Sequence, residues 1–218
     1  MGKIERDLVI KWDAKENLQS AAIRRAKEIL LAGGVVAFPT ESFYGLAVNI
    51  SDERAIKRLF HIKQRPNDQP ILILIPSFQT LQDYVDIIPP FAQTFIQRFW
   101  PGGLTLVFHA GNAVSPLLTA GTGKIGVRLS SHPIATALAR EIAGPITGTS
   151  ANLSGKPPCS SAEDVSMQLG DRIDLILDGG RTSSDKGSTI LDITVHPPVI
   201  LREGMIEREQ LASYLANC

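Results

Sequence analysis

The spacing of apolar positions along the chain predicts an alternation of helices and strands. Apolar residues recur at helical spacing, with polar residues between them, over residues 17–32, 51–64, 133–143, 161–169 and 207–216. Short apolar runs bounded by turn residues predict strands over residues 35–38, 71–75, 104–109, 125–129, 175–177, 189–193 and 199–201. The run at 71–75 is nearly uninterrupted, as in a strand that is covered on both faces.

The order of these elements indicates an α/β protein. Helices and strands follow one another irregularly, which favours a covered, mixed sheet over a regular doubly wound one. No low-complexity linker divides the chain, and no internal repeat is visible. We therefore expect a single domain over residues 1–218, a length that one large α/β domain can have.

Composition places the chain among globular proteins. Hydrophobic residues make up 44% and charged residues 20% of the sequence, which excludes a disordered or collagen-like chain. The first 15 residues are rich in charge and lack the apolar core of a signal peptide, and the apolar runs are too short to span a bilayer. Two cysteines, Cys159 and Cys218, are too few for a disulfide framework. We expect a cytoplasmic protein that has no membrane partner.

Positive charge is concentrated in the first third of a chain whose net charge is zero. Residues 1–65 hold 12 basic and 8 acidic side chains, whereas residues 66–218 hold 10 and 14. Five of these cations occur between residues 54 and 65 without an intervening acid: Arg54, Lys57, Arg58, Lys63 and Arg65. The first three suit the solvated face of a helix. Lys63 and Arg65 stand where that helix ends, and an ammonium beside a guanidinium suits a polyphosphate.

Two other polar segments have two interpretations each. Residues 39–46 place hydroxyls, an aromatic residue and a glycine after a strand, which fits an ordinary turn or a pocket for a small polar ligand. Residues 147–155 combine hydroxyl and amide side chains with two glycines, which fits a turn or a phosphate-binding loop. Arg128 lies within an apolar strand, so it must reach either an anion or a structural carboxylate.

Cations and neutral donors outnumber the candidate acids and bases. No Cys–His pair and no paired carboxylates emerge, so the residues indicate an anion or nucleotide site that works by positioning and charge neutralisation. Residues 121–126 match the GxGxxG string of dinucleotide sites, but a strand rather than a helix is expected to follow it. That string is therefore not interpreted as a cofactor site.

Seven segments, in this order, resemble the YrdC-type threonylcarbamoyl-AMP synthase family. They are PTESFYGL (39–46), KQRPNDQPILI (63–73), WPGGLTLVF (100–108), IGVRLSSHP (125–133), TSANLSGKPP (149–158), GSTILD (187–192) and ILREGMI (200–206). The resemblance covers about residues 34–206. It implies a twisted, mixed open sheet flanked by helices around a positively charged cavity, in the short form of the family without an appended C-terminal domain.

The resemblance implies an ATP-dependent nucleotidyltransferase that joins L-threonine, bicarbonate and ATP into threonylcarbamoyl-AMP and pyrophosphate. Bicarbonate would capture the threonine amine, and the carbamate oxygen would attack the α-phosphate. The product would pass to the tRNA threonylcarbamoyl transferase machinery that modifies adenosine 37, and tRNA itself is a further candidate partner. Mg²⁺ would accompany ATP as part of the substrate, held by few protein ligands.

Similarity to the family also implies roles for individual residues. Lys63 and Arg65 would be catalytic and would hold the ATP phosphates. The other implied ATP-binding residues are Thr105, Ser150, Asn152 and Arg202. Threonine would contact Thr40, Arg128, Ser188 and, as a further candidate, Gln69, with Arg128 facing the carboxylate.

The sequence departs from the family's usual pattern at three sites. Ser42 and Phe43 replace a Thr-Val pair, which would reshape the pocket wall. Gln69 stands where many relatives have histidine, which removes a titratable group. Glu203 stands where proline is frequent and adds negative charge beside Arg202. These departures bear on substrate detail rather than on family membership.

Two other functions compete with the synthase interpretation. An RNA-binding YrdC-like module without synthase activity would use the cationic cluster between residues 54 and 65. The aromatic content of 6% offers such a module few stacking platforms. A hydrolase of phosphorylated small molecules is the third interpretation.

Overall fold

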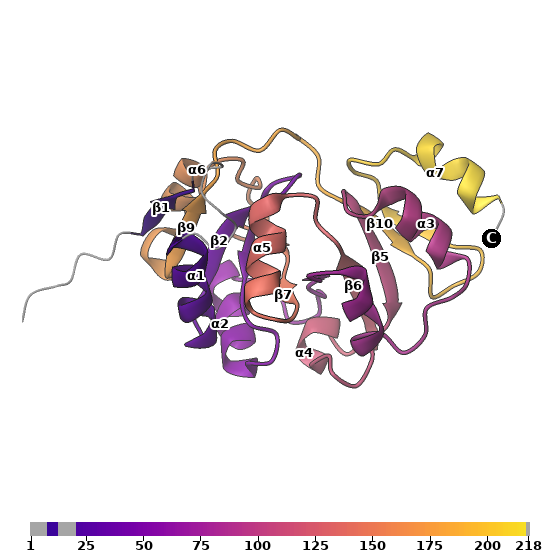
Figure 1. The fold of residues 1–218 in the computed structure, drawn as a ribbon, viewed down its shortest axis with the longest axis horizontal. Helices are drawn as coiled ribbons and strands as arrows, with labels where there is room; N and C mark the ends of the chain where they lie inside the picture. The colour runs from indigo at the N-terminus through magenta and orange to yellow at the C-terminus, as the bar shows by residue number, and fades with distance from the viewer. Residues whose placement is uncertain (1–7, 13–20, 217–218) are drawn as a thin grey trace, which may run out of the picture.

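The strands of this protein form two mixed sheets. The structure, a computed structural model, describes residues 8–12 and 21–216. One sheet has five strands in the order β1 (Val9–Lys11), β9 (Leu175–Asp178), β2 (Val36–Pro39), β3 (Tyr44–Ala47) and β8 (Thr149–Ser150). The other has six strands in the order β11 (Val199–Arg202), β10 (Thr189–Asp192), β5 (Leu104–His109), β6 (Lys124–Arg128), β4 (Ile73–Leu74) and β7 (Ile146–Thr147). Figure 1 shows the two sheets side by side.

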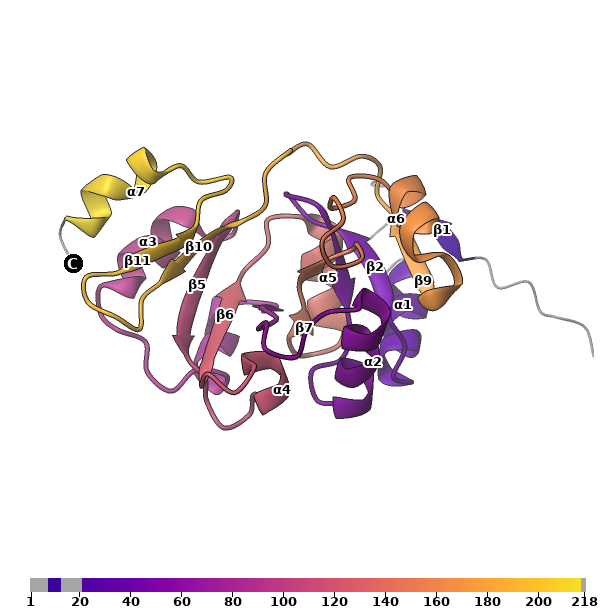
Figure 2. The same cartoon turned by 180° about the vertical axis from the view of Figure 1, so that it is seen from behind.

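Helices cover both faces of the five-stranded sheet. Side chains that alternate along β2 point to opposite faces, so Val36 and Phe38 pack with α1 (Ala21–Leu31) and α5 (Pro133–Glu141). Ala37 packs on the other face, where α2 (Glu53–Lys63) and α6 (Ala162–Leu169) contribute to the core. Figure 2 shows α2 and α6 from this second side.

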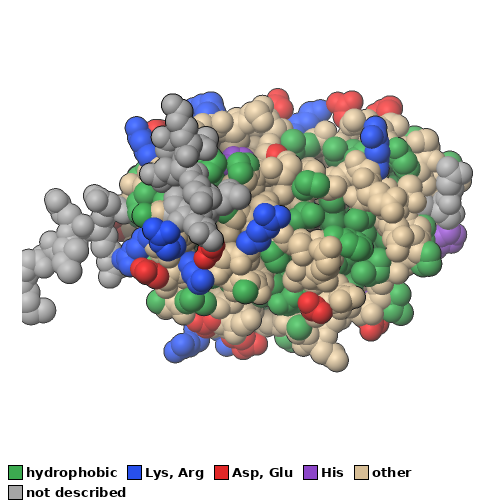
Figure 3. Space-filling view, in the orientation of Figure 1, with side chains coloured by type: hydrophobic (Ala, Val, Ile, Leu, Met, Phe, Trp, Pro, Cys, Tyr) green, Lys and Arg blue, Asp and Glu red, His purple; other side chains and the backbone are tan. Residues whose placement is uncertain are grey.

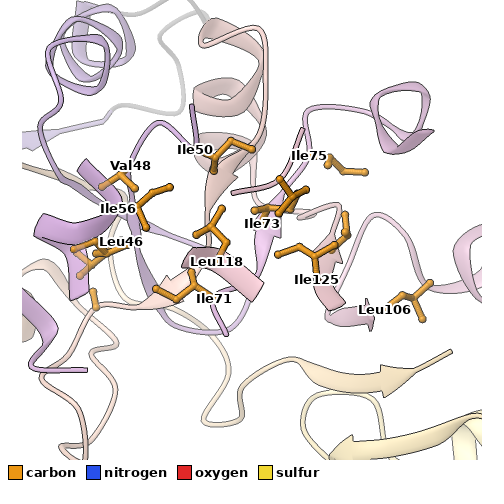
Figure 4. Packing of buried hydrophobic residues seen from close by; sticks show 14 of the residues in the cluster. Leu46, Val48, Ile50, Ile56, Ile71, Ile73, Ile75, Leu106, Leu118 and Ile125 are labelled. Carbon is orange, nitrogen blue, oxygen red and sulfur yellow. The ribbon is translucent and has the colours of Figure 1, made fainter. Parts of the chain in front are cut away.

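One hydrophobic core continues from the five-stranded sheet into the six-stranded sheet. Leu46 of β3 and Ile56 of α2 belong to the same buried cluster as Leu106 of β5 and Ile125 of β6 (Figure 4). The sheets also meet through the backbone, because Thr147 of β7 donates from its amide to the carbonyl of Val48 at 3.3 Å. The cluster includes residues of α3 (Ala92–Phe99), α4 (Pro116–Thr119) and α7 (Arg208–Leu215).

Most predicted elements are confirmed. The predicted helices over 51–64, 133–143, 161–169 and 207–216 correspond to α2, α5, α6 and α7, and each predicted strand has a counterpart. The helix predicted over 17–32 corresponds to α1 at 21–31, and its residues 17–20 lie outside the described residues, as does Cys218. The structure confirms the α/β class and a mixed strand arrangement, and it divides the strands between two sheets.

The differences have local causes. The predicted strand over 71–75 is reduced to Ile73–Leu74, because Ile71 donates its amide to the carbonyl of Leu118 in α4 instead of to a neighbouring strand. The short strands β3, β7 and β8 lie in segments rich in glycine and hydroxyl residues, so they lacked an apolar signal. They are strands because neighbours pair with them: Val36 lies opposite Ala47, and Leu46 lies opposite Thr149.

Two further elements are short. The 3₁₀ helices cover Phe78–Asp83 (η1) and Gly170–Arg172 (η2). Across the residues that the structure describes, no helix has the length and apolar character needed to cross a membrane.

Candidate functional site

A cavity of about 370 Å³ opens where loops from the two sheets meet. The β2–β3 loop and β8 contribute one part of its wall, and β6, the start of β10 and the end of β11 contribute another. Most of the residues implied by the sequence line it: Thr40, Arg65, Arg128, Ser150, Asn152, Ser188 and Arg202. The fold therefore gathers into one cavity side chains from segments far apart in the sequence.

Lys63 lies behind the cavity wall rather than in its lining. The Lys63 side chain is 1% exposed, and its ammonium donates hydrogen bonds to the carbonyl of Ser150 and, at 2.8 Å, to that of Asn152. Burial lowers the pKa of Lys63 to about 7, and the nearby charge of Arg65 adds to this effect. Lys63 therefore ties the end of α2 to the segment after β7 that lines the cavity.

Arg65 reaches the cavity because the chain reverses between it and Lys63. Gln64 caps α2 in the left-handed conformation, with φ 51° and ψ 39°. The Arg65 guanidinium donates to the carbonyls of Gln69 (3.2 Å) and Pro70 (2.8 Å). Burial and the charge of Arg202 lower the pKa of Arg65. These partners are neutral, so Arg65 retains its full positive charge toward the cavity.

The segment that contains Ser150 and Asn152 is held by its own hydrogen bonds. The Ser150 hydroxyl donates to Oδ1 of Asn152 at 2.5 Å, and the Asn152 amide donates to the carbonyls of Leu153 and Lys156. Gly148 lets this segment pass close to β4, because a Cβ at this position would lie 2.8 Å from Cγ of Leu74. The structure shows two short strands here, of which the second lines the cavity, and phosphate binding by this segment stays a prediction.

Arg128 has a carboxylate partner that the sequence did not identify. Its side chain is 3% exposed, and Nη1 lies 2.7 Å from Oε1 of Glu41. The other oxygen of Glu41 accepts a hydrogen bond from the hydroxyl of Ser130. Burial lowers the pKa of Arg128, and the negative charge of Glu41 opposes that shift. Of the two partners expected for a buried arginine, the structure shows the structural carboxylate.

The β2–β3 loop forms a polar wall that is held by internal hydrogen bonds. The hydroxyl of Thr40 donates to the carbonyl of Phe43 at 2.7 Å and accepts from the amide of Ser42 at 3.1 Å. Both hydroxyl residues are nearly inaccessible to solvent, yet they line the cavity. This loop is therefore at once a turn and part of the candidate site.

Ser188 is held between two of the other predicted site residues. The hydroxyl of Thr105 donates to the Ser188 hydroxyl at 2.9 Å, and Arg202 donates to the Ser188 carbonyl and hydroxyl. Burial and the charge of Arg128 lower the pKa of Arg202. Thr105 is 1% exposed and does not line the cavity, so its observed contact is with Ser188.

Gln69 and Glu203 occupy different places relative to the cavity. Gln69 is exposed and absent from the lining, and its carbonyl accepts from Arg65. Glu203 is the one acidic residue in the described lining, and its carboxylate lies 3.8 Å from Arg208. No group of three or more metal-ligating side chains occurs within the described ranges.

Charged side chains of both signs are distributed over the molecular surface. On the face drawn in Figure 3, Lys, Arg, Asp and Glu side chains are mixed around the end of the molecule that carries α1. Hydrophobic side chains are interspersed across the rest of that face. The cations of the candidate site are the three arginines of the cavity lining, Arg65, Arg128 and Arg202.

Comparison with known proteins identifies the family. The Sua5/YciO/YrdC family model, described as "Telomere recombination", matches residues 28–204. The chain belongs to this family. It is 41% identical over 205 residues to the threonylcarbamoyl-AMP synthase of Pyrococcus abyssi, covering 94% of this chain and 60% of the relative. It is 42% identical over 194 residues to that of Bacillus subtilis, covering 88% of this chain and 56% of the relative.

A solved structure agrees with these sequence matches. The crystal structure of P. abyssi Sua5 complexed with L-threonine superimposes with a TM-score of 0.91 and 39% identity, over 94% of this chain and 60% of that one. The chain thus spans about 60% of the length of the first relatives that it matches. The α/β fold with mixed sheets is therefore the fold of the Sua5/YciO/YrdC family.

The sequence analysis missed two residues that hold Arg128 in place. Glu41 and Ser130 both contact Arg128 or its partner, and they stand 89 positions apart in the chain. Glu41 lies in the segment 39–46, where attention fell on the hydroxyls. An isolated carboxylate directly after one strand and an isolated arginine inside another were the available signals.

Proposed function

We propose that this protein catalyses the formation of threonylcarbamoyl-AMP and pyrophosphate from L-threonine, bicarbonate and ATP, with release of water. The observation that carries the proposal is the distribution of charge in one cavity. Arg65 and Arg202 have neutral partners, whereas Arg128 is paired with Glu41 and stands beside the hydroxyls of Thr40 and Ser42. The end of the cavity that carries Arg65 and Arg202 thus suits a polyphosphate, and the end that carries Arg128 suits an amino acid.

The phosphate end would hold ATP. Arg65 and Arg202 would bind phosphate oxygens through charge-assisted hydrogen bonds, and Ser150 and Asn152 would line the nucleotide site. Lys63 would support this end electrostatically from behind the segment that it anchors. Because the transferred group is an adenylate, these cations would neutralise charge that develops on the leaving pyrophosphate.

The amino-acid end would hold L-threonine. Arg128 would face the carboxylate, and Thr40 and Ser188 would supply polar contacts. The structure of the P. abyssi relative with L-threonine supports an amino-acid site in this fold. The observed geometry gives Gln69 no place in the cavity lining, so a direct contact of Gln69 with threonine would require a rearrangement of the 65–70 loop.

Reaction would follow from the proximity of the two ends. After the threonine ammonium loses a proton to solvent, its amine forms a C–N bond with bicarbonate and water leaves, which gives a carbamate. Attack of the carbamate oxygen on the α-phosphate then displaces pyrophosphate. No general base is needed to deprotonate that carboxylate-type oxygen, which agrees with a cavity rich in cations and hydroxyls. The main contribution of the protein is then to hold two anionic reactants close together.

Mg²⁺ fits this site as part of the ATP substrate. The described lining offers one carboxylate, Glu203, and neutral oxygens, so a magnesium ion would be held mainly by phosphate oxygens. When bound, it would neutralise phosphate charge. The residues of the chain would orient the phosphates around it.

The proposed product has a consumer of defined chemistry. Threonylcarbamoyl-AMP is a mixed anhydride, so we propose that a tRNA threonylcarbamoyl transferase in the cytoplasm takes the acyl group for adenosine 37. Direct contact of this protein with tRNA belongs to the same proposal and is tested separately below.

Pyrophosphate release tests the proposed reaction. Purified protein should release pyrophosphate from Mg–ATP only when L-threonine and bicarbonate are both present. Omission of threonine, and removal of carbon dioxide from the buffer, are the matched controls. Turnover that does not depend on threonine would instead favour a hydrolase, and the absence of any turnover would contradict the synthase proposal.

RNA binding has one observation in its favour. A broad surface hollow of about 940 Å³ is lined by Lys57, Arg58, His61, Arg65 and Arg172, so it adjoins the cavity through Arg65. However, Arg58 is engaged by Asp174. Under this alternative, Lys57→Ala would weaken tRNA binding and lower its salt dependence, while the threonine-dependent turnover would be absent. Electrophoretic mobility shift at several salt concentrations measures it.

A further inference from the structure

The three arginines in the cavity would attract a polyphosphate equally if nothing distinguished them. Arg65, Arg128 and Arg202 all line the cavity. They also influence one another, because Arg202 contributes to the lowered pKa of Arg65 and Arg128 contributes to that of Arg202. A polyanion that occupied all three would leave no cation for the carboxylate of an amino acid.

Only one of these arginines has an internal counter-ion among the described residues. Arg65 donates to two backbone carbonyls, and Arg202 donates to the carbonyl and hydroxyl of Ser188. These acceptors are neutral dipoles. Arg128 instead forms an ion pair with Glu41 at 2.7 Å, in surroundings where its side chain is 3% exposed. Such burial strengthens the attraction between the two charges, because little water screens it, and makes the loss of either partner costly.

Both oxygens of the Glu41 carboxylate are engaged. Oε1 accepts from Arg128, and Oε2 accepts from the hydroxyl of Ser130. The Ser130 hydroxyl is itself held, since it accepts from the amide of His132 at 3.1 Å. Glu41 comes from the loop after β2 of the five-stranded sheet, whereas Arg128 and Ser130 belong to the end of β6 in the six-stranded sheet. The carboxylate therefore bridges the two halves of the cavity wall.

The pairing engages one nitrogen of the guanidinium. Glu41 and Ser42 both take their hydrogen bonds from Nη1 of Arg128. The Nε of Arg128 is buried and has no hydrogen-bond partner among the described residues. An unpaired buried donor is costly, so a local shift that admits a ligand carboxylate to the Nε and Nη2 edge would relieve that cost.

We propose that Glu41 is a positioning residue that divides the cavity by charge: it neutralises and orients Arg128, so that this arginine accepts an amino-acid carboxylate while polyphosphate is directed to Arg65 and Arg202. The inference rests on the proposed function, because it concerns how that function separates its two anionic substrates. Binding of a single carboxylate depends on a correctly oriented guanidinium, whereas binding of a triphosphate depends mainly on net positive charge.

Calorimetric titration of Glu41→Gln tests the division. This variant keeps the shape of the side chain and removes its charge. Threonine binding should weaken at least tenfold, while ATP binding should change by less than about threefold. Inorganic pyrophosphate should compete with threonine in Glu41→Gln and should not compete in the wild-type protein. In turnover, KM for threonine should rise with KM for ATP unchanged.

Two more variants separate positioning from a structural role. Glu41→Asp restores the charge and should recover part of the threonine affinity and abolish the competition by pyrophosphate. Ser130→Ala keeps the charge but frees one oxygen, so it should weaken threonine binding severalfold without such competition. Glu28→Gln is the matched control, because Glu28 forms an exposed pair with Arg25 at 3.0 Å, and no ligand affinity should change.

Several results would overturn the inference. Unchanged threonine affinity in folded Glu41→Gln would do so, as would pyrophosphate that already competes with threonine in the wild-type protein. If Glu41→Gln fails to fold, Glu41→Asp and Ser130→Ala decide by their threonine affinities, and wild-type values in both would reject it. Absence of threonine binding to the wild-type protein would refute the proposed function itself, which keeps the two failures distinct.

Discussion

The burial of Lys63 changes the role that the sequence predicted for it. The sequence favoured a direct phosphate ligand, but the ammonium is engaged by two backbone carbonyls and is shielded from solvent. A buried ammonium is costly, which is why its pKa falls to about 7. Its role as a catalytic group thus stays a prediction, and the structure supports an electrostatic role from behind the wall.

The lowered pKa of Lys63 predicts proton uptake when ATP binds. A pKa of about 7 predicts that Lys63 is largely neutral in the free protein at pH 8. Bound polyphosphate favours the ammonium and raises that pKa, so binding should take up protons and should weaken as pH rises above 7. Calorimetry in two buffers of different ionisation enthalpy measures the uptake, since the ATP phosphates are already ionised at pH 8.

Lys63→Met is the control for this prediction. The variant removes the titrating group, so the proton uptake should disappear. Equal heats in both buffers for the wild-type protein would contradict the assignment of this pKa to ATP binding.

Arg65 provides a second test at the scale of one residue. Arg65→Ala should weaken ATP binding by about 1.5–3 kcal/mol, the range for hydrogen bonds to charged groups. Arg54→Ala is the matched control, because Arg54 lies in the helix that precedes Arg65 and its side chain is 95% exposed. ATP titration of both variants measures the difference. Equal affinities in folded proteins would return Arg65 to the role of a surface charge.

At the scale of elements, the end of α2 organises the candidate site. Asp52 caps the start of this helix by accepting from the amides of Arg54 (2.9 Å) and Ala55 (3.2 Å). At the other end, the left-handed Gln64 separates a buried Lys63 from a cavity-lining Arg65. The helix was predictable from its apolar spacing, whereas the reversal at its end was not, because glutamine carries no strong signal for that conformation.

Gln64 predicts opposite effects for two substitutions. Gln64→Gly should raise the free energy of unfolding by about 0.5–1 kcal/mol, because glycine adopts positive φ without steric cost. Gln64→Val should lower it by about 1–2 kcal/mol, since a β-branched residue is disfavoured there. Urea unfolding monitored by circular dichroism measures both. If the two variants are equally stable, the left-handed turn is not retained in solution.

At the scale of the whole molecule, the cavity depends on two sheets that share one core. β7 lies beside β3 through the contact of Thr147 with Val48, and the buried cluster continues across this junction. The two ends of the proposed site draw residues from both sheets, such as Thr40 from one and Arg128 from the other. A ligand in the cavity therefore contacts both halves of the fold.

This arrangement predicts that ATP and L-threonine stabilise the protein cooperatively. Each ligand at 100 times its Kd should add about 2.7 kcal/mol, and binding of the first should order the wall that the second contacts. The rise in Tm with both ligands should thus exceed the sum of the separate rises. Thermal melts with D-threonine as the stereochemical control measure this, and simply additive shifts would contradict coupling between the two ends.

The sequence by itself determined five of the described helices, the most apolar strands and the family, because these depend on local spacing and on motifs that can be read in order, whereas α3 and α4 were not predicted. It also identified most of the cationic and hydroxyl residues that line the cavity. Only the tertiary structure decided that the strands form two sheets, that Lys63 lies behind the wall, and that Arg128 is paired with Glu41. Burial and partners arise from contacts between distant segments, so they determine which of several like charges can meet a ligand.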